Sequence, residues 1–318
     1  MRDATSSTIA VVIPVYQSEQ TVAACLASVL GQTFRDFEVV VVDDGSTDRS
    51  ADIVADVARR DGRVQLIRND INRGVAESLN VGLSATDADL VARLDADDEA
   101  VATRLERQVE LLGSAPEVVV CGSFVTYMGR TAGRDSVGQV PVSDAQIRRT
   151  LRDTEHSPFF HPSVMFRRPT VVSVGGYRGF FANAEDYDLW LRLAPEGAFH
   201  NIPVPLTRYR VSTHGASLSR LREQRLYARL ARIAADVPEK DLAELWDELV
   251  SDLDESEMTA YLTREHRQQA SLLADLGHPL AAVTLLLRSR SQIGARAGLD
   301  FVAHRLTRAV GRRVRALV

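Results

Sequence analysis

Three short polar segments contain side chains that could bind a ligand or a metal ion, and each follows an apolar run. These segments are Pro14–Gln17, Asp43–Ser46 and Asp95–Asp98. Ligands of open α/β sheets bind where the carboxyl ends of the strands deliver their loops. If the three segments meet there, five carboxylates converge, and they repel one another unless a divalent cation or hydrogen-bond donors hold them. The alternative for each Asp is a helix cap or a turn.

The elements that would position these segments alternate between apolar strands and amphipathic helices. The strands predicted in the first hundred residues are Ile9–Ile13, Phe37–Val42, Val64–Ile67 and Asp89–Leu94. Apolar residues recur at helical spacing between them, for example from Val22 to Leu30. Fully apolar strands that alternate with helices predict a mostly parallel α/β sheet covered on both faces.

The pattern changes after residue 100. Further strands are predicted at 117–128, 163–166 and 198–209, and helices at 102–112 and 186–193. From about Ser217 onward the pattern is helical throughout. We therefore predict one α/β domain over residues 1–216 and a helical C-terminal region over residues 217–318.

Composition is that of a globular protein and excludes a disordered or a fibrous chain. Of 318 residues, 45% are hydrophobic and 25% are charged. No window of eighteen residues is continuously apolar, so no transmembrane helix is expected, and the first apolar run is too short for a signal peptide. Cys25 and Cys121 fit no disulfide or metal framework, which favours a reducing cytoplasm.

The charge is distributed unevenly along the C-terminal region. Residues 236–260 contain ten acidic side chains and one basic one, Lys240, whereas residues 261–318 contain ten arginines and three acidic side chains. Residues 299–318 form a basic amphipathic helix on a helical wheel, which is typical of a membrane-surface element at the inner face of a membrane. The alternative is packing against the acidic helices of 236–260. Nucleic-acid binding is not expected, because the basic stretch has few aromatics and no recognised motif.

Several sequence blocks, in this order and spacing, resemble the family 2 glycosyltransferases. The blocks are VVIPVYQ at 11–17, FEVVVVDDGSTD at 37–48, RNDINRGVAESLNVGL at 68–83, LDADD at 94–98, HPSVMFRR at 161–168, GGYRGFFANAEDYDLWLRL at 175–193 and YRVSTHGASLS at 209–219. The resemblance covers about residues 8–215. It implies the GT-A nucleotide-diphospho-sugar transferase fold, with a nucleotide-binding half at about 1–100 and an acceptor half at about 101–216.

The resemblance implies a nucleotide-sugar donor site in the first half. Pro14 to Tyr16 resemble the floor on which the base stacks, and Asp44 resembles the carboxylate that accepts the base N3–H, which favours UDP or dTDP. Asp43 is left as a residue that holds the turn. Arg68 resembles the basic residue near the base and phosphates, and Asp95 resembles the ribose ligand.

The resemblance also implies a metal ion. Asp97 resembles the metal-binding Asp of the DxD motif, and His214 resembles a histidine that some members use as a further metal or diphosphate ligand. Arg210 is expected near the diphosphate. The ion would be Mn²⁺ or Mg²⁺, because both bind carboxylate and diphosphate oxygens.

The acidic pair Glu185-Asp186 resembles the residues that supply the general base, with Asp186 preferred and Glu185 as the alternative. Asp186 opens a predicted helix, whose dipole favours the ionised carboxylate. His161 resembles the segment that enters the acceptor side. The resemblance thus implies an inverting, metal-dependent glycosyltransferase that moves one sugar to a hydroxyl of a saccharide or lipid-linked acceptor in cell-surface glycan synthesis. A QxxRW processive motif is missing, which favours a non-processive enzyme.

Two other functions remain open from the residues. One is a non-catalytic saccharide-binding protein on the same fold, against which the intact acidic residues argue. The other is a haloacid-dehalogenase-like phosphatase, because Asp43-Asp44-Gly45-Ser46-Thr47 loosely resembles its DxDGT strand end. That class also needs a lysine, and the only lysine, Lys240, is poorly placed for it.

Overall fold

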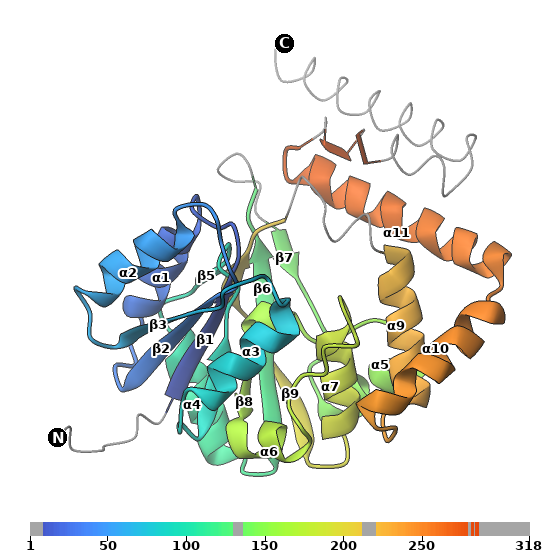
Figure 1. Cartoon of the computed structure of the whole chain (residues 1–318), viewed down its shortest axis with the longest axis horizontal. Coiled ribbons are helices and arrows are strands. Elements are labelled where there is room, and N and C mark those ends of the chain that lie inside the picture. The colour runs from blue at the N-terminus through green and yellow to red at the C-terminus, as the bar shows by residue number, and fades with distance from the viewer. Residues whose placement is uncertain (1–8, 130–135, 212–220, 279–280, 283, 286–318) are drawn as a thin grey trace. The chain divides into compact units, whose positions relative to one another are not determined.

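The structure is a computed structural model that describes residues 9–129, 136–211, 221–278, 281–282 and 284–285 (Figure 1). The described chain divides into two compact units. The first comprises the residues up to Tyr127, Val137–Arg210 and Tyr227–Leu245, and the second comprises the other described residues. The domain boundary predicted at residue 216 lies outside the described residues. Among those that are described, no helix is both long and apolar enough to cross a membrane.

The first half of the sheet is parallel, as the apolar strands predict. Its strands are β1 (Ile9–Val15), β2 (Phe37–Asp43), β3 (Val64–Arg68) and β4 (Leu90–Arg93). They lie in the order β3-β2-β1-β4, all parallel, with Val15 of β1 opposite Asp43 of β2. Helices α1 (Val22–Leu30), α2 (Ser50–Ala58) and α3 (Val75–Ser84) connect them. The carboxyl ends of the strands therefore lie along one sheet edge.

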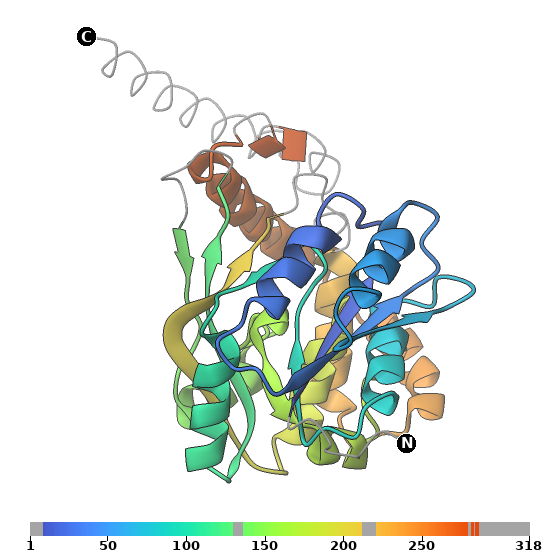
Figure 2. The ribbon, with the colours of Figure 1, turned by 90° about the vertical axis from the view of Figure 1, so that its left-hand side faces the viewer.

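The second half of the sheet mixes directions. Its strands are β5 (Glu99–Ala100), β6 (Val118–Tyr127), β7 (Ser136–Gly138), β8 (Met165–Arg167) and β9 (Ala198–Tyr209). Strand β8 runs antiparallel between β4 and β6 and joins the two halves into one sheet (Figure 2). Strands β6 and β9 pair in parallel, and β5 runs antiparallel to β9.

Helices α4 (Arg104–Ser114), α5 (Asp144–Asp153), α6 (Arg168–Ser173) and α7 (Glu185–Leu193) belong to this second half, together with the 3-10 turn η1 (His161–Ser163). Helix α7 begins one residue before the predicted position. Its first turn contains three acidic side chains and its last turn contains Arg192, an arrangement that complements the helix dipole.

The core is centred on β1, β2 and β4, whose aliphatic and aromatic side chains are buried. Helix α3 packs closely on β1 through Gly82, where an added Cβ would lie 2.4 Å from a methyl group of Val12. A buried cation, Arg104, donates hydrogen bonds to the carbonyl oxygens of Arg93 (2.6 Å) and Val164 (3.0 Å). It thereby ties the end of β4 to the segment between η1 and β8.

The helical prediction for the C-terminal region is confirmed for its described residues. They form α9 (Leu221–Ile233), the turn η2 (Glu239–Asp241), α10 (Leu242–Ser251) and α11 (Glu255–Asp275). In the second unit, Leu221 and Leu226 pack with Met258, Tyr261 and Leu262 of α11. The predicted basic helix 299–318 lies outside the described residues.

Candidate active site

The carboxyl ends of β1 and β2 bring Pro14, Tyr16 and Asp44 together. The backbone N–H of Asp44 donates to the carbonyl of Val15 (2.8 Å), and the side chain of Tyr16 is half exposed. The Asp44 carboxylate accepts from Asn69 Nδ2 (2.8 Å) and from the backbone N–H groups of Arg73 (3.0 Å) and Gly74 (2.8 Å). A carboxylate has about four acceptor positions, so three donors leave room for one more.

Asp43, the residue before Asp44, is fully buried at the end of β2, where it pairs with Arg68 of β3. Its Oδ2 lies 3.4 Å from Nε of Arg68, whose side chain is 58% exposed. Among the described residues, neither oxygen of Asp43 has a hydrogen-bond partner. Asp44, rather than Asp43, makes the side-chain hydrogen bonds that hold the adjoining loop. Arg68 is held at the end of β3 by this one ion pair and is otherwise accessible.

The end of β4 presents the acidic cluster Asp95, Asp97 and Asp98. One carboxylate oxygen from each lies within 4.8 Å of the others. Arg93 forms an ion pair with Asp95 at 2.5 Å. The backbone N–H of Arg210 donates to Asp98 Oδ1 (2.7 Å), and Arg210 Nε donates to the carbonyl of Asp97 (3.0 Å). Arg210 thus lies beside the cluster.

The electrostatics of this cluster fit a divalent cation. Burial and the charge of Asp95 raise the pKa of Asp97 to about 6, and burial with both neighbours raises the pKa of Asp98. Asp98 Oδ2 is buried and lacks a hydrogen-bond partner among the described residues. Grouped carboxylate oxygens are the ligands that Mn²⁺ and Mg²⁺ prefer. Asp95, Asp97 and Asp98 can therefore hold such an ion, whereas His214 lies outside the described residues.

The acidic pair Glu185 and Asp186 forms the first turn of α7. Glu185 is buried, and burial with the neighbouring Asp186 charge raises its pKa to about 7. Asp186 is half-buried. Burial raises its pKa, and a hydrogen bond from Ser157 partly offsets this rise. The indole N–H of Trp190 donates to Ser157 Oγ at 3.2 Å. Ser157 is thus held between Trp190 and the more accessible carboxylate, Asp186.

His161 and Tyr177 lie behind this pair. His161 Nε2 is 3.0 Å from the Tyr177 hydroxyl, and His161 Nδ1 is 3.8 Å from Glu185 Oε1. Burial lowers the pKa of His161, and the charge of Arg93 lowers it further, so the ring is neutral near pH 7. The imidazole therefore serves as a hydrogen-bonding group beside Glu185 and not as its counter-ion.

Glu185→Gln is expected to raise the melting temperature at pH 8 by a few degrees and to lose this gain near pH 4.5. The pKa of Glu185 in the folded chain, about 7, lies above its ordinary value of 4.5. The folded state therefore binds more protons between these pH values, and stability falls as pH rises through that window. Gln cannot ionise, so the variant does not lose this stability as the pH rises. Thermal unfolding of wild type and of Glu185→Gln at pH 8 and at pH 4.5 measures the effect. An equal difference in melting temperature at both pH values would contradict the raised pKa of Glu185.

Some residues of this site were not predicted from the sequence. Arg93 is buried, and its positive charge acts on both acidic groups. It lowers the pKa of Asp97 in the first group and of Glu185 and Asp186 in the second. A signal for it exists, since a charged residue in an apolar strand directly before an acidic cluster needs a buried partner. Tyr177 and Ser157 offer no local signal, because their roles depend on contacts with distant residues.

Solved structures share this fold. Staphylococcus aureus TarS 1-349, in complex with UDP-GlcNAc, matches with a TM-score of 0.59 and 18% identity, over 93% of this chain and 89% of that one. The chain spans 54% of a longer TarS structure. Mannosyltransferase PcManGT from Pyrobaculum calidifontis, in complex with GDP-Man and Mn²⁺, matches with a TM-score of 0.53 and 19% identity, over 99% of this chain and 84% of that one. The predicted GT-A fold class is confirmed.

The sequence comparisons identify the family. The profile of Glycosyl transferase family 2 matches residues 10–176, so the chain belongs to that family. The amylovoran biosynthesis glycosyltransferase AmsE of Erwinia amylovora is 32% identical over 206 residues, which cover 64% of this chain and 76% of AmsE. The predicted glycosyltransferase function is confirmed at this level.

Proposed function

We propose that this chain is an inverting glycosyltransferase that uses a UDP- or dTDP-sugar and a divalent cation. The observation that supports it most is the arrangement of two acidic groups about one buried cation, Arg93. The cluster at Asp95–Asp98 would meet the diphosphate, and the pair Glu185-Asp186 would meet the acceptor. TarS with UDP-GlcNAc and PcManGT with GDP-Man and Mn²⁺ share the fold and add support for a nucleotide-sugar donor.

The donor site is proposed at the ends of β1, β2 and β3. The base would stack on Pro14 to Tyr16 and donate its N3–H to the remaining acceptor position of Asp44. Arg68 and Arg210 would contact the phosphates, and Asp95 would bind the ribose. Asp97, with His214 as a further ligand, would hold Mn²⁺ or Mg²⁺, and the ion would stabilise the negative charge of the leaving nucleoside diphosphate.

The proposed reaction is one in-line displacement. Asp186 takes the proton of the acceptor hydroxyl while that oxygen forms a bond to the anomeric carbon of the sugar. The bond from the anomeric carbon to the phosphate oxygen breaks, and its electron pair leaves with the nucleoside diphosphate. Attack occurs on the face opposite the leaving group, so the configuration inverts. One sugar is transferred per reaction, to a hydroxyl of a saccharide or a lipid-linked acceptor of cell-surface glycan.

A thermal-shift panel of nucleotide-sugars with Mn²⁺ tests the donor assignment. UDP- or dTDP-sugars should stabilise the chain, because a ligand at a hundred times its Kd adds about 2.7 kcal/mol to the free energy of unfolding. GDP- and CDP-sugars serve as the controls. Stabilisation by GDP-sugars alone would contradict the role of Asp44, and a bound UDP-sugar that is consumed neither by transfer nor by hydrolysis would contradict the reaction.

Deletion of residues 299–318 is expected to leave donor turnover largely intact and to reduce binding to anionic liposomes. We propose that this basic amphipathic segment, which lies outside the described residues, makes a peripheral contact with a membrane. Wild-type binding should weaken as salt rises, because the attraction is electrostatic. Sedimentation with phosphatidylserine and with neutral phosphatidylcholine vesicles measures this. Aggregation of the truncated chain would instead place the segment in the protein core.

A further inference from the structure

The loop between α6 and α7, residues 174–184, leads directly into the acidic pair and adopts a backbone that needs support. Gly175, Gly176 and Asn183 have positive φ angles of 88°, 70° and 67°. At Gly176 an added Cβ would lie 2.6 Å from Asn80 Oδ1, so a larger residue would displace the loop from its partner. Glycine adopts positive φ without a steric penalty, so contacts from outside the loop decide which conformation it holds.

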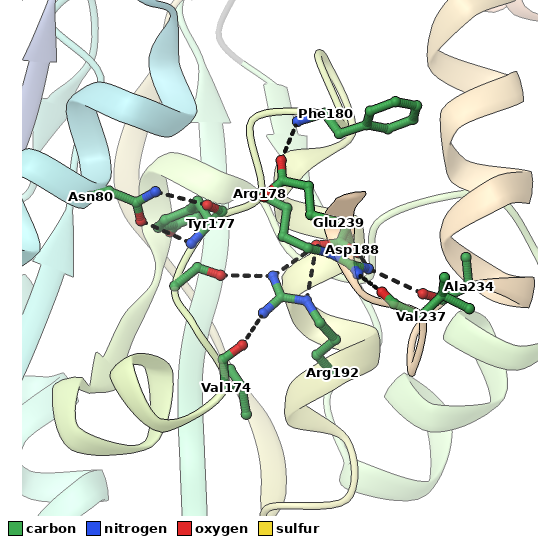
Figure 3. A network of polar contacts seen from close by, with 11 residues as sticks. Asn80, Val174, Tyr177, Arg178, Phe180, Asp188, Arg192, Ala234, Val237 and Glu239 are labelled. Atoms are coloured by element: carbon green, nitrogen blue, oxygen red, sulfur yellow. Dashed lines mark hydrogen bonds and ion pairs between the residues drawn. The ribbon is translucent and has the colours of Figure 1, made fainter. Parts of the chain in front are cut away.

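One such contact comes from α3 in the nucleotide-binding half. The Asn80 side chain forms both possible hydrogen bonds with the backbone of Tyr177 (Figure 3). Its Nδ2 donates to the Tyr177 carbonyl at 2.7 Å, and its Oδ1 accepts from the Tyr177 N–H at 2.9 Å. This pairing fixes Tyr177 in position and direction, because two antiparallel hydrogen bonds to one residue leave little rotation.

A second contact comes from α7 itself. The fully buried carboxylate of Asp188 lies between Arg178 of the loop and Arg192 of the next helical turn. The Arg192 guanidinium also donates to the loop carbonyls of Val174 and Gly176, each at 2.7 Å (Figure 3). The helix that begins with Glu185 and Asp186 is thus tied to both ends of the segment Val174–Arg178.

A third contact comes from beyond the α/β part of the chain. Arg178 donates to the carbonyls of Val237 (2.7 Å) and Ala234 (3.3 Å). The backbone N–H of Phe180 donates to Glu239 Oε1 at 2.9 Å (Figure 3). The segment Ala234–Glu239, between α9 and α10, therefore holds the same loop from the other side.

We propose that Asn80, Asp188 and the segment Ala234–Glu239 form a clamp on residues 174–184 that positions the acidic pair for proton transfer. The Tyr177 ring extends from the clamped backbone to His161, which faces Glu185. The clamp therefore connects α3, beside the donor site, with the first turn of α7. This inference rests on the proposed function, because positioning matters only if the pair takes the acceptor proton.

Catalytic geometry is sensitive to such support. A misplacement of about 1 Å far from the reacting atoms can cost about 10²-fold in rate. Stability alone does not explain the buried Arg178–Asp188–Arg192 group, because a buried ion pair is weak evidence for stability. Its hydrogen bonds to four backbone carbonyls fix the loop in one arrangement.

Asn80→Ala is the first test, because it removes both bonds to Tyr177 at a helical position where Ala is favoured. Turnover is followed as UDP release with Mn²⁺, using whichever of UDP-N-acetylglucosamine, UDP-glucose and UDP-galactose gives the most product. We expect kcat to fall by about ten- to a hundredfold while KM for the donor stays within about twofold. Ser84→Ala is the matched control, since Ser84 lies on the same helix and, within the described part of the chain, its hydroxyl donates only to the Asn80 carbonyl.

Glu239→Ala and Glu239→Gln form a second pair at an exposed residue. The Ala variant removes the acceptor of the Phe180 N–H and should lower kcat, whereas Gln keeps that oxygen and should restore it. Hydrogen exchange of the amides in 174–184 should be faster in Asn80→Ala and Glu239→Ala than in wild type and the two controls. This readout does not depend on activity.

Unchanged exchange in Asn80→Ala would overturn the clamp. Faster exchange with unchanged kcat would overturn its role in positioning the acidic pair, and a raised KM at unchanged kcat would assign Asn80 to donor binding instead. If the wild-type chain turns over no UDP- or dTDP-sugar, the proposed function fails. The exchange experiment would still decide whether Asn80 and Glu239 hold the loop.

Discussion

Turnover is expected to fall by about 10²–10⁴-fold when Asp186 is replaced by Asn, with donor affinity close to wild type. Asn keeps the size and the hydrogen-bonding reach of the side chain, including its contact with Ser157, but it cannot take a proton. Donor affinity should persist because the proposed role of this carboxylate is toward the acceptor and not the donor. Rates of sugar transfer or of UDP release measure the first effect, and calorimetry with UDP and Mn²⁺ measures the second.

Glu185→Gln is the matched control for this experiment and should cost less. Glu185 is buried behind Asp186 and faces the neutral ring of His161, so it is poorly placed to meet an acceptor hydroxyl. An inactive Glu185→Gln beside an active Asp186→Asn would move the base by one residue. A product that retains the anomeric configuration of the donor, seen by NMR, would exclude a single displacement whichever variant is inactive.

Asp97→Asn should weaken nucleotide binding in Mn²⁺ by at least about a hundredfold while the fold persists. Changes to the partners of metal ligands typically cost 10–100-fold in metal affinity, so the loss of a charged ligand should cost at least as much. The exchange of one oxygen for an amide nitrogen barely changes the volume. Isothermal calorimetry with UDP, in the presence of Mn²⁺ and after its removal with a chelator, measures the effect.

Asp89→Asn is the control for that substitution. Asp89 is an exposed carboxylate directly before β4, at the end of the strand opposite the cluster, so it tests the loss of one negative charge away from the cluster. Its nucleotide affinity should equal that of wild type. Equal affinity of Asp97→Asn and wild type in Mn²⁺ would show that Asp97 is not a ligand. Cooperative unfolding of both variants, with melting temperatures no lower than that of wild type, would confirm that the fold is unaffected.

The sequence predicted the parallel half of the sheet and the place of its acidic residues because both depend on local pattern. Apolar runs define β1, β2 and β4, and the sheet-edge rule then places Asp44 and Asp95. The antiparallel insertion of β8 was not predicted, because a strand of three residues has no readable direction. Pairings such as Asn80 with Tyr177, 97 residues apart, depend on the completed fold.

Roles within the acidic groups were also only partly readable. The sequence shows two adjacent carboxylates at 185–186, but it does not show which of the two is accessible. Burial decides that: Glu185 turns toward His161, while Asp186 meets Ser157. The sequence shows Arg93 as a charged residue within an apolar strand. Its effect on the pKa values of both acidic groups could not be predicted, because that effect depends on their positions in the folded chain.

The contacts of Ala234–Glu239 have a consequence for where the chain can be cut when shorter versions are made. A fragment that stops near residue 216 would keep every strand of the sheet, yet it would strip Arg178 of the two carbonyls that receive its guanidinium and leave the Phe180 amide without Glu239. A minimal catalytic fragment should therefore extend through Leu245, where the first compact unit ends. The same reasoning discourages exchanging the helical tail between relatives at that earlier point, since the incoming tail would have to present its carbonyls at the same places.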